Sequence, residues 1–122
     1  LILISHDLGV IARHVGHMMV MYGGMVVESG PTREVFAHRA HPYTRGLFGS
    51  HPSLAGPDSR PGGPRRRLPA IAGTVPELHA LPPGCPFADR CPVALPACTH
   101  QRPEPVAISA GHHASCLRLE AA

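Results

Sequence analysis

The N-terminal stretch of the chain reads LILISHDL over residues 1–8. Its first four residues are large aliphatics in an unbroken run, which is typical of a strand buried on both faces in a parallel sheet. Polar residues then end the strand, and Asp7 suits the N-cap of a following helix. The stretch therefore predicts a strand with His6 at its carboxyl end, which is the edge where α/β folds place ligands.

The next forty residues continue the α/β pattern. Apolar residues spaced by three and seven from Leu8 predict a helix that ends near residues 14–16. Two apolar runs, 18–22 and 25–28, flank Gly23-Gly24, and this is a hairpin signal. Pro31 and Pro42 favour the starts of two short helices, one over about 32–38 and one to about Phe48. The four methionines of this region are expected in the hairpin core.

The second half has a different composition. Most of the 15 prolines lie there, and so do all four cysteines. The whole chain of 122 residues is long enough for one small domain. We expect three parts: an α/β part over 1–49, a linker rich in Pro, Gly and Arg over 50–68, and a small irregular cysteine-rich module over 69–122.

Charge and hydropathy exclude several classes of protein. The formal net charge is +3, every basic residue is Arg, and only Arg65, Arg66 and Arg67 cluster, so we expect no nucleic-acid partner. No apolar run approaches the roughly 20 residues that cross a bilayer, and no signal peptide is visible. The opening strand would need a neighbour to pair with, so we expect the chain to be a fragment of a longer protein.

The four cysteines are the candidate metal ligands. They are separated by five, six and seventeen residues, which is not the paired C-x-x-C spacing of zinc ribbons. A segment with so few aliphatic residues needs another source of order. Three alternatives remain open: a [4Fe–4S] cluster whose charge Arg90 or Arg118 offsets, a four-cysteine zinc site, or two disulfides. Nearby histidines (His100, His112 and His113) are expected at the surface. The candidate ligands are Cys85, Cys91, Cys98 and Cys116.

Three motifs in order carry a family resemblance. The segment LISHDL at 3–8 resembles the switch-histidine segment of ABC ATPases, and YGGMVVESGP at 22–31 is similar to the hairpin that follows it. The segment HPYT at 41–44, combined with PGCPF at 83–87 and the later cysteines, resembles the C-terminal extension of oligopeptide/dipeptide importer ATP-binding subunits. For HPYT itself we expect packing rather than a binding role.

The resemblance implies a fold and a role for one residue. The fold would be the C-terminal end of a P-loop NTPase (ABC ATPase) domain, followed by the linker and the cysteine-rich module. His6 would be the switch histidine that contacts the γ-phosphate of ATP, with Mg²⁺ held elsewhere in the full-length enzyme. The chain contains no G-x-x-x-x-G-K-[ST] loop, no signature helix and no Walker B acidic pair. We therefore expect this chain alone neither to bind nor to hydrolyse ATP.

The resemblance also implies partners, a location and a cofactor. The partners would be a second ATP-binding subunit, two transmembrane permease subunits and a solute-binding protein, at the cytoplasmic face of the plasma (inner) membrane. The resemblance favours the [4Fe–4S] cluster over zinc at the four cysteines.

Two other functions stay open. One is a stand-alone four-cysteine module for protein interaction or redox sensing, and the other is the same ATPase serving nickel or another small solute.

Overall fold

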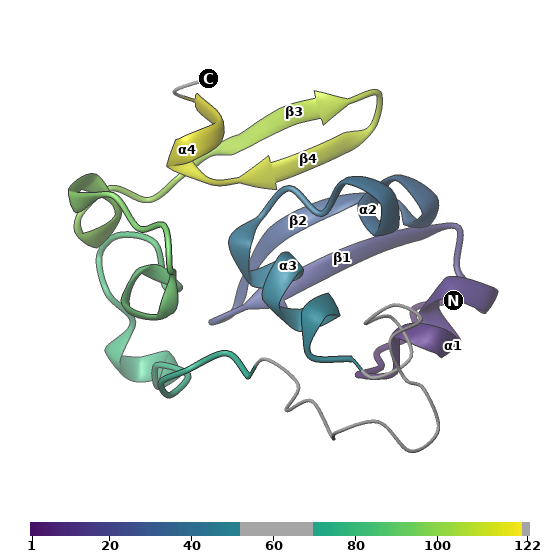
Figure 1. Cartoon of the computed structure of the whole chain (residues 1–122), viewed down its shortest axis with the longest axis horizontal. Coiled ribbons are helices and arrows are strands. Elements are labelled where there is room, and N and C mark those ends of the chain that lie inside the picture. Colours follow the sequence, from purple (N-terminus) through teal and green to yellow (C-terminus); the bar gives the residue numbers. More distant parts are fainter. Residues whose placement is uncertain (52–69, 121–122) are drawn as a thin grey trace, which may run out of the picture.

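The computed structural model describes residues 1–51 and 70–120, which form a mixed α/β structure built on one antiparallel sheet (Figure 1). The four strands lie in the order β1-β2-β4-β3. They are β1 (His17–Tyr22), β2 (Met25–Pro31), β3 (Pro105–Ser109) and β4 (His112–Ser115). The sheet therefore combines the predicted hairpin with a second hairpin from the far end of the chain.

Helices surround the first hairpin. Helix α1 (Leu8–His14) precedes β1, and α2 (Thr32–His38) and α3 (Pro42–Gly49) follow β2. In Figure 1, α2 and α3 lie over the face of the β1–β2 hairpin. All five of these elements were predicted within one to three residues, including the Asp7 N-cap of α1.

The first hairpin closes through a tight turn. Gly23 and Gly24 have φ of 55° and 76°, in the left-handed region that glycine adopts without strain. A register shift between Val20 and Met21 marks a bulge in β1. Met18, Val20 and Tyr22 point into the core, whereas Met19 and Met21 are exposed. The expectation that all the methionines lie in the core was therefore wrong, because side chains alternate between the two faces of a strand.

The predicted opening strand is not formed. Residues 1–4 have no strand partner in the described parts of the chain, and Leu1, Ile2 and Ile4 are almost fully exposed. The aliphatic run has strand composition, but a strand also needs neighbouring backbone with which to hydrogen-bond.

The cysteine-rich part is more regular than predicted. It contains three short 3₁₀ helices, namely η2 (Leu78–Ala80), η3 (Ala88–Arg90) and η4 (Pro96–Thr99), then β3, β4 and the short helix α4 (Leu117–Glu120). Pairing of Glu28 with Ala114 and of Ser29 with His113 joins β4 to β2. The part over 69–122 thus shares a sheet with the part over 1–49. Nearly all of the predicted linker, residues 52–68, lies outside the described residues.

Buried residues from both halves form a single core. Val35, Val27 and Tyr22 from the first half pack in the same cluster as Phe87 and Leu117 from the second. Partly buried Tyr43 and Leu47 pack against this cluster, as expected for the HPYT helix. The core therefore lies between the β1–β2 hairpin and the loops around η3 and η4, which carry Cys85, Cys91 and Cys98 and are called the cysteine loops below.

Gly84 gives a direct test of how the cysteine loops pack. The N–H of Cys85 donates to the carbonyl of Cys98 at 2.8 Å, and a Cβ on Gly84 would lie 2.2 Å from that same carbonyl oxygen. We expect Gly84→Ala to lower the free energy of unfolding by about 3 kcal/mol, since backbone would have to move. Gly16→Ala is the control, because a Cβ there meets nothing within 4 Å. Equal urea midpoints for the two variants would contradict this packing.

Candidate functional site: His6, the cysteine loops and the junction between them

His6 lies in the short segment before α1. Its side chain is exposed, and the adjacent Asp7 accepts hydrogen bonds from the N–H groups of Gly9 (2.8 Å) and Val10 (3.1 Å). These two bonds lower the pKa of Asp7 below its ordinary value. Asp7 is therefore the helix cap that the sequence predicted, and the His6 imidazole beside it is accessible to a ligand from solvent.

The four cysteines lie in the loops around η3 and η4 and at the end of β4. Cys85 and Cys91 flank η3, Cys98 lies within η4, and Cys116 directly follows β4. Three of the four sulfurs have backbone N–H groups beside them: that of Phe87 at Cys85, that of Val93 at Cys91, and that of Leu95 at Cys98 (3.4 Å). Such N–H groups stabilise negative charge on sulfur, which suits thiolate ligands.

The thiols influence one another electrostatically. Burial raises the pKa of Cys85, and the other three thiols raise it further against the effect of the Phe87 N–H. Burial likewise raises the pKa of Cys91, whereas Arg118 lowers it. The two cysteines are thus held as neutral thiols unless a cation compensates for their charge.

The described residues do not form a closed metal site. In residues 1–51 and 70–120, no three His, Cys, Asp or Glu side chains are close enough to hold one ion, and all four cysteines are free thiols. The disulfide alternative is therefore not realised in this structure. The donors have the right chemistry for a soft metal or an iron–sulfur cluster, and a shared site would require the loops to draw the sulfurs together.

The junction between the two halves is an aromatic cluster. Phe87, from the first cysteine loop, is 1% exposed and lies 5.1 Å from Tyr22, 5.4 Å from Tyr43 and 5.9 Å from His41, measured between ring centroids. Tyr22 and Tyr43 contact each other at 4.7 Å. Contacts of this geometry add to the gain from apolar burial. Three of the segments that carried the family resemblance, those at 22–31, 41–44 and 83–87, therefore meet at one place in the structure.

Arg90 stabilises the same junction through hydrogen bonds. Its guanidinium donates to the Tyr22 hydroxyl (3.0 Å) and to the backbone carbonyls of Ile71 (2.9 Å) and Ala72 (2.7 Å). Three bonds in different directions use the fork geometry that only arginine provides. Two arginines were predicted to offset charge on the cysteines. Arg90 is engaged in this contact instead, whereas Arg118 lowers the pKa of the Cys91 thiol.

A buried polar cluster at Glu28 is the feature that sequence reasoning missed. Glu28 and His112 are both 0% exposed at the side chain, and Nε2 of His112 donates to Oε1 of Glu28 at 2.8 Å. The backbone N–H groups of Ala40 (2.8 Å) and His41 (2.9 Å) donate to the same carboxylate. The prediction that His112 lies at the surface was wrong; a carboxylate on an inward-facing strand position was the available signal for a buried partner.

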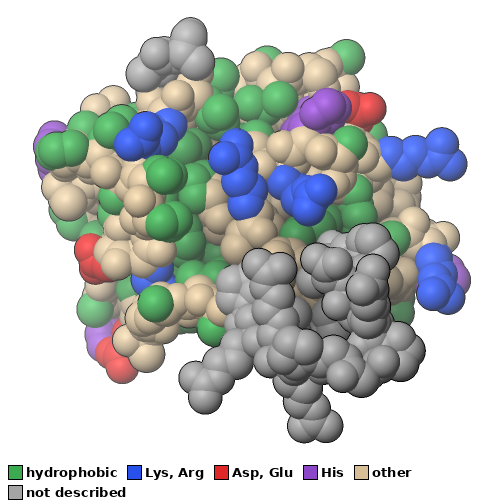
Figure 2. All heavy atoms as spheres, in the orientation of Figure 1, with side chains coloured by type: hydrophobic (Ala, Val, Ile, Leu, Met, Phe, Trp, Pro, Cys, Tyr) green, Lys and Arg blue, Asp and Glu red, His purple; other side chains and the backbone are tan. Residues whose placement is uncertain are grey.

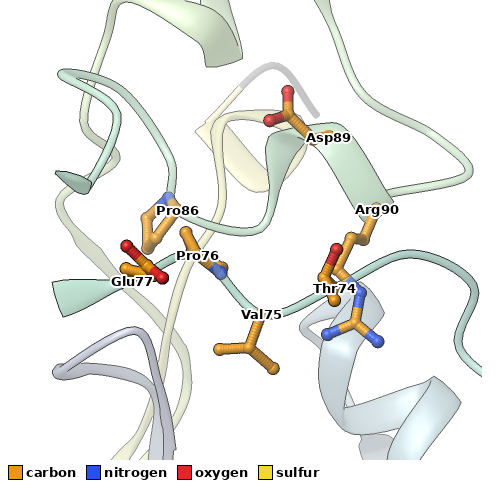
Figure 3. Close-up of a pocket in the computed structure, with 7 residues that line it drawn as sticks. All are labelled: Thr74, Val75, Pro76, Glu77, Pro86, Asp89 and Arg90. Carbon is orange, nitrogen blue, oxygen red and sulfur yellow. The ribbon is translucent and has the colours of Figure 1, made fainter.

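A shallow hollow beside the junction does not add to the site. It measures about 430 Å³ and is lined by Thr74, Val75, Pro76, Glu77, Pro86, Asp89 and Arg90. Figure 3 shows the Arg90 guanidinium turned away from the carboxylates of Glu77 and Asp89. On the face in Figure 2, the basic side chains are spread among apolar and polar atoms.

Comparison with known proteins identifies the region. Residues 27–98 match the family described as the oligopeptide/dipeptide transporter, C-terminal region. The chain belongs to this family. The matched residues include Glu28, the HPYT segment, Phe87 and Arg90, so the family region supplies these parts of the junction, and Tyr22 lies before it.

Individual relatives match nearly the whole chain. An oligopeptide transport ATP-binding protein from Mycobacterium tuberculosis is 43% identical over 98% of the chain. A peptide ABC transporter ATP-binding protein from Sinorhizobium fredii is 43% identical over 94%, and a peptide import ATP-binding protein from Brucella ovis is 44% identical over 98%. The chain spans only 18%, 32% and 35% of these three proteins. Its described helices include none that is both long and apolar enough to cross a bilayer.

His41 of the HPYT segment predicts a pH dependence of stability. Burial lowers its pKa from 6.5 to about 4, and its Nδ1 accepts from the N–H of Tyr43 at 3.1 Å, which caps α3. The unfolded chain takes up a proton near pH 6.5, whereas the folded state keeps the imidazole neutral down to about 4. The contribution of His41 to the free energy of unfolding is therefore fully present above pH 6.5 and decreases as the pH falls from 6.5 to 4. Between pH 7.5 and 5 we expect a loss of about 2 kcal/mol.

The comparison that isolates this effect is His41→Asn, because asparagine can still cap the helix and does not titrate. Urea denaturation at several pH values should give a shallower slope for the variant than for the wild type. Identical slopes would show that His41 does not carry the effect.

Proposed function

We propose that this chain is the C-terminal part of the ATP-binding subunit of an ABC importer that takes up oligopeptides or dipeptides. The observation that carries the proposal is the match over nearly the whole chain to peptide-transport ATP-binding proteins. The junction supports it, because Tyr22, the HPYT segment and Phe87 pack together instead of lying in independent units.

In this proposal His6 contacts the γ-phosphate of ATP. An imidazole N–H can donate to a phosphate oxygen, and the bonds that fix Asp7 also fix the backbone next to His6. Mg²⁺ and the phosphate-binding loop would belong to the rest of the full-length protein. Hydrolysis by two such subunits would drive permease subunits and a solute-binding protein, with the ATPase peripheral to the cytoplasmic face of the membrane.

For the cysteines we propose a shared site for a [4Fe–4S] cluster, with zinc as the alternative. Cys85, Cys91, Cys98 and Cys116 would hold it, and the N–H groups beside three of the sulfurs favour that chemistry. When bound, the group would supply the positive charge that keeps buried thiols deprotonated.

A stand-alone cysteine module is the less favoured function. Such a module would be expected to fold apart from the preceding residues. Here the pairing of β4 with β2 and the bonds of Arg90 and His112 tie it to the first half of the chain. The transported solute is a separate question, since membrane partners would select it.

His6 can be tested by its effect on turnover. In the full-length protein assembled with its permease, we expect His6→Ala to lower the kcat of ATP hydrolysis on the order of 100-fold, because a hydrogen bond to the transferred phosphoryl group is lost. The KM for ATP should change little, since most ATP contacts lie elsewhere. His14→Ala is the matched control, being an exposed histidine at the end of the helix that follows His6. Equal kcat values for both variants would remove His6 from the mechanism.

The cysteine proposal is tested by metal analysis. Full-length protein purified without oxygen should contain about four irons and four acid-labile sulfides per chain, with visible absorption. Cys98→Ser should lose them, whereas the neighbouring Thr99→Ser should keep them. Stoichiometric zinc without iron would favour the alternative, and absence of both from the wild type would disprove a shared metal site.

A further inference from the structure

Strand β4 is attached to the molecule at two ends. At its start, His112 is fully buried, bonds to Glu28 and packs against Gly30, where a Cβ would lie only 3.0–3.1 Å from His112 atoms. At its finish, Cys116 directly follows the strand, and the next residue, Leu117, is buried with Cys85, Phe87 and Cys98. The Arg118 side chain also donates to the carbonyl of Val93, in the loop between Cys91 and Cys98.

Between these ends β4 has few other attachments to the first half of the chain. Its register with β2 comprises two pairs, Glu28 with Ala114 and Ser29 with His113. On its other side it pairs with β3, which is an edge strand of the described sheet. A displacement of the cysteine loops would therefore act on a short strand whose far end carries His112.

Glu28 would transmit that displacement. Its carboxylate accepts from His112 and from the N–H groups of Ala40 and His41, which form the turn between α2 and α3. Removing one partner from a buried charge is costly, because the remaining donors do not replace it. Without His112 the carboxylate would gain by moving toward water, and the two backbone N–H groups would lose their acceptor.

We propose that β4 couples the chemical state of the four thiols to the turn between α2 and α3 through the His112–Glu28 hydrogen bond. The free thiols hold the end of β4 and keep His112 on Glu28. Covalent modification of the thiols displaces the cysteine loops, withdraws His112 and frees the amides of Ala40 and His41. This coupling concerns the thiols when they are free of metal, and it does not depend on the transported solute.

The test is hydrogen exchange, followed by mass spectrometry, on the reduced full-length protein before and after reaction with N-ethylmaleimide. Each thiol adds across the maleimide double bond: a sulfur–carbon bond forms, and the thiol proton ends on the adjacent carbon. Peptide mapping establishes that the four cysteines have reacted. We expect exchange of the Ala40 and His41 amides to rise about tenfold or more, while the Val15 amide, bonded to Ile11 in α1, stays protected.

Matched variants distinguish this specific coupling from a general loss of amide protection. In His112→Leu, which has no donor for Glu28, the two amides should exchange fast already and show no further response to the reagent. His113→Leu, one residue along β4 and only half-buried, should respond as the wild type does. Cys116→Ser should weaken the response. Unchanged Ala40 and His41 exchange in fully modified wild type would overturn the proposal, and so would an equal rise at Val15, which would mean general unfolding.

Discussion

The carboxylate of Glu28 is the contact on which the arrangement of both halves depends. It is completely buried, and three donors satisfy it: one from β4 and two from the turn that joins α2 to α3. A buried carboxylate with fewer donors would be strongly destabilising. The position of β4 beside β2 and the entry into α3 are therefore fixed by the same side chain, and neither can shift without leaving a charge unpaired.

The aromatic junction adds a second constraint on the position of the cysteine loops. Phe87 fills the space beside Tyr22 and Tyr43, and Arg90 reaches the Tyr22 hydroxyl from the next turn. This packing explains why the HPYT and PGCPF segments, far apart in the sequence, belong together. The expectation of a packing role for HPYT was correct, although the contribution of His41 as helix cap and of its backbone N–H as donor to Glu28 could not be anticipated.

Local signals predicted the first half well. The Asp7 cap, the Gly23-Gly24 turn and the Pro42 helix start all depend on neighbours within a few residues, so the sequence contains them. Long-range pairing was harder. Nothing local indicates that residues 112–115 join β2, or that His112 is buried, because 84 residues separate it from Glu28. The strand predicted for residues 1–4 was wrong for the same reason, since a strand forms only beside a partner strand.

The choice of a polar contact at this position has a consequence for register. Apolar residues of similar size could give comparable stability, since replacing both partners of a buried hydrogen bond by apolar groups of the same shape can be nearly neutral. They would not fix β4 as firmly, because apolar surfaces tolerate sliding. A slip of one residue would move Ala114 from its place opposite Glu28 and turn the His112 side chain to the other face of the sheet. The carboxylate would then lose its third donor, so the Glu28–His112 bond selects the single register in which the cysteine loops meet Tyr22 and Tyr43.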